Sequence, residues 1–166
     1  HEMFTLNADT LELDNPFTYG VLAHEYQHMI HWNQDRNEES WLNEGFSELA
    51  MFLNGYSTGG VVQRYANNPD IQLNHWPAED EDSLAHYGAS FLFTAYFLDR
   101  FGPDATRALI SDPANGLESI DSVLAHRIKI GSLDGGTISA DDVFSDWVVA
   151  SYLQDDQVDE GQYTYH

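Results

Sequence analysis

The chain has 166 residues, of which 42% are hydrophobic and 13% aromatic, a composition typical of a globular domain and not of a disordered chain. It carries 28 acidic and 6 basic residues, and the resulting net charge of −22 argues against a nucleic-acid partner, because binding phosphates requires a basic surface. The absence of cysteine excludes disulfides and thiolate metal sites, so any metal must be held by histidine and carboxylate side chains.

The sequence alone allows two explanations of the strongly acidic composition. One is adaptation to a salt-rich medium, in which the repulsion between like charges is screened. The other is an ordinary acidic extracellular protein, with or without calcium sites. No run of about 18 apolar residues occurs, so we expect no membrane span. The chain starts abruptly at "HEMFTL", and we expect residues 1–166 to be a single catalytic domain taken from a longer protein.

In chain order, the pattern predicts a mainly helical α+β fold. The first segment, "EMFTLNADTLEL", places Phe4, Leu6 and Ala8 on one alternating face, which predicts an edge strand of a small sheet. Asn15 as a cap and Pro16 at the first helical position predict a helix over 16–33. Further helices are expected over 40–53, in a short stretch within 61–82, and over 83–102, 104–111, 116–128 and 139–153.

The first helix carries the main chemical signal, in "LAHEYQHMIHW". His24 and His28 are four residues apart, so a helix would project both rings from one face and bring them close enough to bind one ion. Glu25 follows His24 directly and would stand beside the metal, where a carboxylate can take a proton from a water molecule that the metal activates. The His-Glu-x-x-His pattern also arises by chance in unrelated proteins, so the residues around it must show whether it marks a metal site.

Two histidines do not complete a catalytic zinc site, which usually has three protein ligands. His31 is a poor third ligand, because seven residues of helix place it roughly 10 Å from His24 along the axis. We expect His31 to be a partly buried histidine stabilised by the helix dipole.

Glu44 and Glu48 are better candidates for the third ligand, since a buried helix with two carboxylates on one stripe needs a nearby cation. We predict Glu44 as the third ligand and Glu48 as the acceptor of the outer N–H of His24. The apolar residues of the second helix, Trp41, Leu42, Phe46 and Leu49, are expected to pack it against the first.

"HEYQH" followed by "WLNEGFSELA" resembles the zincin metallopeptidases of the gluzincin type, whose second helix carries an Asn-Glu motif followed by an acid, here Asn43, Glu44 and Glu48. The phrase from Leu22 to Ala50 is most similar to the secreted prokaryotic hyicolysin-like and immune-inhibitor-A-like peptidases. The resemblance implies a zincin-like catalytic domain, one catalytic Zn²⁺, peptide substrates and a secreted or cell-surface location. One departure is the spacing: fifteen residues separate His28 from Glu44, fewer than in thermolysin, so the connector must be tight.

The resemblance also implies a mechanism in which Glu25 is the general base, and an N-terminal strand that holds an extended substrate by main-chain pairing. The group that stabilises the oxyanion stays open between Tyr87 and His86, at the start of the long helix. We expect an endopeptidase.

Two alternatives remain at this point: a non-catalytic zinc-binding adhesion module and an acidic calcium-binding structural domain. The sequence does not predict the oligomeric state.

Overall fold

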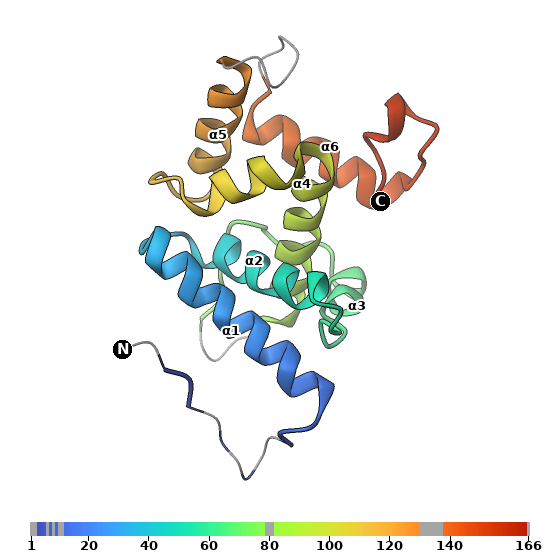
Figure 1. The fold of residues 1–166 in the computed structure, drawn as a ribbon. Coiled ribbons are helices and arrows are strands. Elements are labelled where there is room, and N and C mark those ends of the chain that lie inside the picture. The colour runs from blue at the N-terminus through green and yellow to red at the C-terminus, as the bar shows by residue number, and fades with distance from the viewer. Residues whose placement is uncertain are drawn as a thin grey trace.

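The computed structural model describes residues 3–5, 7, 9, 12–78, 82–129 and 138–165, and these residues form a helical bundle (Figure 1). No helix within these ranges is long and apolar enough to cross a membrane. The helices are α1 (Pro16–Gln34), α2 (Ser40–Leu53), α3 (Val61–Asn67), α4 (Leu84–Ile110), α5 (Leu117–Lys129) and α6 (Ala140–Leu153), followed by the short 3-10 turn η1 (Asp159–Gly161).

The predicted α+β class is wrong for the part of the chain that the structure describes, because that part contains helices and no strand. Phe4 lies in a segment with no regular secondary structure, and the other two residues of the predicted strand face, Leu6 and Ala8, lie outside the described residues. An alternating pattern yields a stable strand only when a neighbouring strand takes up its backbone N–H and C=O groups. No described segment offers such a partner.

The helix termini follow the predicted capping signals. The Asn15 side chain accepts a hydrogen bond of 2.9 Å from the backbone N–H of Phe17 at the start of α1. Ser139 and Asp142 form a reciprocal capping box at the start of α6. The predicted end of the long helix at Gly102 appears as a break inside α4, where Gly102 has φ 79° and lets the chain turn before Pro103 starts the second segment.

α2 lies between α1 and α4, and the three helices form the half of the bundle that carries the site (Figure 1). The crossing of α2 and α4 is close because its contact residues are small. A Cβ on Gly45 would lie 2.7 Å from the backbone oxygen of Ser90, and the Thr94 hydroxyl donates to the Gly45 carbonyl at 3.0 Å. This crossing fixes the position of α2, which carries Glu44.

The apolar residues of α2 pack differently from the prediction. Trp41 contacts Phe93 of α4, with ring centroids 5.5 Å apart, and only Phe46 meets a ring of α1, that of His31 at 5.7 Å. The main core therefore lies between α2, α4, α5 and α6, and α1 is an outer helix that rests on α2. The buried core side chains include Trp41, Leu42, Phe46, Phe93, Tyr96, Phe97, Leu109, Ile120, Leu124, Val143 and Trp147.

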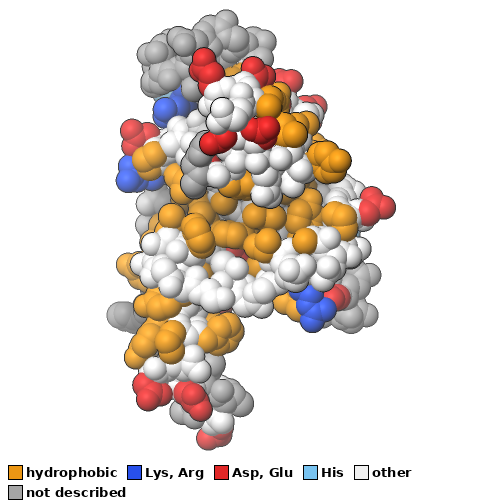
Figure 2. Space-filling model, turned by 90° about the vertical axis from the view of Figure 1, so that its right-hand side faces the viewer, with side chains coloured by type: hydrophobic (Ala, Val, Ile, Leu, Met, Phe, Trp, Pro, Cys, Tyr) orange, Lys and Arg blue, Asp and Glu red, His pale blue; other side chains and the backbone are white. Residues whose placement is uncertain are grey.

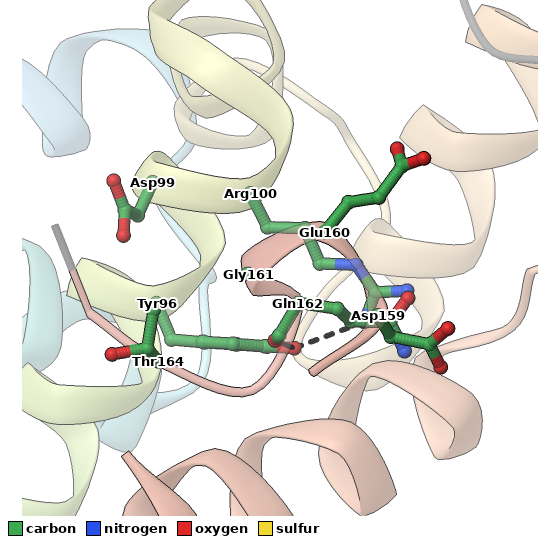
Figure 3. Close-up of a pocket in the computed structure, with 8 residues that line it drawn as sticks. All are labelled: Tyr96, Asp99, Arg100, Asp159, Glu160, Gly161, Gln162 and Thr164. Carbon is green, nitrogen blue, oxygen red and sulfur yellow. Dashed lines mark hydrogen bonds between the residues drawn. The ribbon is translucent and has the colours of Figure 1, made fainter. Parts of the chain in front are cut away.

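The segment after α6 returns to α4 and is fastened there by polar groups (Figure 3). The Tyr96 hydroxyl donates to the backbone oxygen of Gln162 at 2.8 Å, and Arg100 donates to the Tyr96 hydroxyl at 3.0 Å. Arg100 also pairs with Asp146 of α6. These contacts join three chain segments at a distance from the histidines of α1.

An apolar hollow of about 290 Å³ lies where the end of α2 meets the middle of α4. Figure 2 views the molecule from the side of α3 and the C-terminus and shows hydrophobic side chains gathered across the middle of this face. The lining includes Phe52, Leu53, Leu92, Leu98 and Tyr165. The hollow contains no cluster of charged or metal-ligating side chains and is separate from the residues described next.

Candidate metal centre

Three side chains from α1 and α2 converge on one point: His24, His28 and Glu44. The Nε2 atoms of His24 and His28 are 3.0 Å apart, and the Glu44 Oε2 atom lies 3.2 Å from the first and 3.3 Å from the second. A four-coordinate zinc ion with bonds of about 2.0–2.1 Å separates its ligand atoms by about 3.3 Å. The three atoms therefore form a triangle of the size that one such ion requires.

The outer nitrogens of the two rings face oxygen acceptors. The Nδ1 atom of His24 is 3.3 Å from Oε1 of Glu48, and the Nδ1 atom of His28 is 3.0 Å from Oδ1 of Asn43. A neutral ring that donates its Nδ1–H outward leaves a lone pair on Nε2. Glu44 Oε2 is itself buried and accepts no hydrogen bond. Three lone-pair atoms within about 3 Å of one another repel unless a cation lies among them, so these residues fit a divalent metal ion.

The same electrostatics appear in the pKa values of the metal-free cluster. Burial lowers the pKa of His24, but the carboxylates of Glu44 and Glu48 outweigh it and raise the pKa to about 9. Burial raises the pKa of Glu44, but the two histidines outweigh it and lower the pKa to about 2. Without metal, a proton on the rings supplies the positive charge that the carboxylates need.

Ser47 belongs to this arrangement and was missed at the level of sequence. Its side chain is fully buried, and its hydroxyl lies 3.0 Å from Nδ1 of His28 while it also donates to the backbone oxygen of Asn43 at 3.1 Å. Asn43 and Ser47 are four residues apart, so both side chains project from the same side of α2, towards His28. The four-residue spacing from Asn43 could have predicted that Ser47 also lies beside a ligand histidine.

His31 lies away from this centre, in the interface of α1 with α2. It is fully buried rather than partly buried, and burial lowers its pKa to about 4, so the ring is neutral. The prediction of a partly buried ring is therefore wrong. The ring packs edge-on against Phe46 and acts as part of the core.

Glu25 lines two cavities, one on each side of it. The first, of about 390 Å³, lies towards α3 and the start of α4 and has largely apolar walls that include Val21, Met51 and Leu84. The second, of about 700 Å³, is wider and is lined by His28 and Glu44 together with Met29 and Trp32. Glu25 lines both cavities, His24 lines the first, and His28 and Glu44 line the second; we refer to the two cavities together as the groove.

Tyr87 and His86 differ in where they lie. Tyr87 lines the first cavity with His24 and Glu25, and its ring centroid is 6.2 Å from that of His24. Burial, followed by the charges of Glu44 and Glu48, raises its pKa to about 12, so its hydroxyl stays protonated. His86 lines neither cavity beside Glu25 and packs against His75 and Trp76.

No family model matches the chain. The chain is similar to the neutral metalloprotease ShpI of Staphylococcus hyicus, with 28% identity over 135 residues. This match covers 72% of the present chain and 30% of the relative, so the chain spans only about a third of that protein's length. At this identity the similarity supports a relationship to metalloproteases.

Proposed function

We propose that this chain is the catalytic part of a zinc-dependent peptidase. The observation that carries the proposal is the triangle of lone-pair atoms from His24, His28 and Glu44, with the carboxylate of Glu25 beside it in an open groove. A structural metal has no need of a free carboxylate next to it, whereas hydrolysis requires a base. The similarity to a metalloprotease supports the same proposal.

Zinc is the metal that the donor set favours. Two imidazole nitrogens and one carboxylate suit Zn²⁺, whereas Ca²⁺ takes six to eight oxygen ligands. We therefore set aside a calcium-binding structural domain. The role of the metal, when bound, is to lower the pKa of a water molecule and to polarise the carbonyl of a peptide bond.

Each surrounding side chain then has a distinct task. Glu25 accepts a proton from the attacking water and delivers it to the leaving amine. Tyr87, protonated at neutral pH, donates a hydrogen bond to the oxyanion that develops on the substrate carbonyl. Glu48 fixes the ring of His24, and Asn43 with Ser47 fixes the ring of His28, so both Nε2 atoms point at the same place.

The shape of the groove supports internal cleavage. Glu25 has a cavity on each side, so a peptide can extend in both directions from the bond at the centre. An enzyme that removes terminal residues would instead close one side and bind a free terminus there. The net charge of −22 supports work in a salt-rich medium, where salt screens the repulsion between the protein's own charges.

The test is cleavage of a mixed library of blocked peptides by the purified protein. We expect internal cuts that a chelator abolishes and added zinc restores. Glu25→Gln should bind zinc as wild type does and lose cleavage, while Glu118→Gln, the same change at an exposed residue of α5, should retain it. If zinc-loaded wild type cuts no peptide, a non-catalytic zinc-binding module becomes the better description.

A further inference from the structure

The groove beside Glu25 has largely apolar walls that carry three carboxylates and, among the described residues, no lysine or arginine. Glu48 faces the cavity on the α3 side, Glu44 faces the wider cavity, and Glu25 faces both. Neither lining contains lysine or arginine. Even with a divalent ion in place, three carboxylates outweigh its two positive charges.

The few basic residues of the chain do little to offset this charge. Arg100 is paired with Asp146, and Arg107 is paired with Asp104 in the second segment of α4. Arg36 lies 5.8 Å over the ring of Trp32, which lines the wider cavity, and Arg64 lies on α3 three residues after Val61, which lines the other. These two arginines face a whole-chain charge of −22.

Such a field selects among substrates before any contact is made. A cleft lined by one sign of charge raises the local concentration and the association rate of oppositely charged ligands by about 10-fold to 1,000-fold at low salt. It repels ligands of the same sign. The effect shrinks with salt, because the Debye length falls from about 30 Å at 0.01 M to about 3 Å at 1 M.

Resting on the proposed peptidase function, we propose that the site selects cationic peptides: those with lysine or arginine flanking the cleaved bond, over those with glutamate or aspartate there. The preference arises from the field of the acidic surface and of the groove carboxylates. It therefore acts on substrate capture and not on the chemical step.

The test uses three blocked peptides of equal length with one central apolar residue, flanked by lysine, serine or glutamate. The binding of N-methylated, uncleavable versions of these peptides to zinc-loaded wild type is measured by fluorescence anisotropy, and the cleavage of the unmodified peptides by wild type is measured as kcat/KM. At about 0.01 M salt we expect the lysine peptide to exceed the glutamate peptide at least about tenfold in both readouts. At about 1 M salt the ratio should fall towards one, while kcat stays similar for all three.

Two matched pairs of substitutions locate the effect. Asp14→Asn with Asp82→Asn removes two charges that lie, along the sequence, within three residues of Phe17 and Leu84 in the groove lining. Asp156→Asn with Glu160→Gln removes two charges from the C-terminal segment instead. The first pair should lower the lysine-to-glutamate ratio at low salt more than the second.

Equal binding of the three peptides at low salt, or a ratio that persists at about 1 M salt, would overturn the proposal, the latter because it implies a specific contact. Loss of all chelator-sensitive cleavage would instead contradict the peptidase function, and the binding ratios would still decide the selectivity of the groove.

Discussion

Raising the pH of the metal-free protein should destabilise it between about pH 6.5 and pH 9. The pKa of His24 rises from 6.5 to about 9 on folding, because the proton on this ring offsets the charges of Glu44 and Glu48. A folded-state pKa above the unfolded value contributes stability that is fully present below about pH 6.5 and is lost as the pH passes through about 9. At about 1.4 kcal/mol per pKa unit, the loss is at most about 3.5 kcal/mol, with little discount for screening because the side chain is only 12% exposed.

Urea unfolding followed by tryptophan fluorescence, at a series of pH values, measures this loss. Excess zinc should reverse the trend, because metal replaces the proton and binds more tightly as the rings deprotonate. Burial lowers the pKa of His28, but Glu44 and Asn43 outweigh it and raise this pKa as well, so His24→Gln should reduce the pH dependence and the double change His24→Gln with His28→Gln should remove most of it. His126→Gln, at an exposed position of α5, should preserve it. A metal-free stability that is constant across the window, or an equal fall in the double variant, would refute the reasoning.

Three further predictions concern single residues. Glu48→Gln should weaken zinc binding about 10-fold to 100-fold in a competition titration, because the ring of His24 loses the carboxylate that orients it. Tyr87→Phe should lower kcat about 100-fold to 1,000-fold and leave zinc affinity unchanged, as expected for an oxyanion donor that does not hold the metal. Gly88→Ala should cost about 1–3 kcal/mol of stability, because its Cβ would overlap the backbone oxygen of Val61 and lie 2.8 Å from Cβ of Tyr65.

The first two of these predictions have a matched control. Glu118→Gln repeats the change at Glu48 on an exposed site, and Tyr26→Phe repeats the change at Tyr87 on a ring that is 56% exposed. Equal zinc affinity in Glu48→Gln and wild type would show that the carboxylate does not orient the ring. An unchanged kcat in Tyr87→Phe would remove Tyr87 from the mechanism. A Gly88→Ala protein as stable as wild type would show that α3 and α4 can move apart without a cost in stability.

Local signals predicted the helices well, because each signal acts within a few residues. The cap at Asn15, the capping box at Ser139 and the break at Gly102 all occur as the sequence indicates. The candidate residues His24, His28 and Glu44 also come together as expected, since a four-residue spacing fixes which groups share a helix face and two buried carboxylates require a cation.

Features that depend on long-range partners could not be predicted in the same way. The alternation around Phe4 looks like a strand, but a strand depends on a partner that its own residues do not encode. Which of Tyr87 and His86 lies near His24 depends on the rotation of α4 against α1. The packing of α2 on α1 was predicted correctly for Phe46, but Trp41 packs on α4, because α1 and α4 are both suitable partners for the apolar residues of α2.

X-ray absorption at the zinc edge, on protein loaded with one equivalent of zinc, tests the central claim most directly. We predict a first coordination shell of nitrogen and oxygen at about 2.0–2.1 Å, with the scattering pattern of two imidazoles. Glu44→Ala should weaken binding and change that shell, because one of its oxygen ligands is lost. A protein that binds no zinc, or a shell without imidazole, would contradict the account.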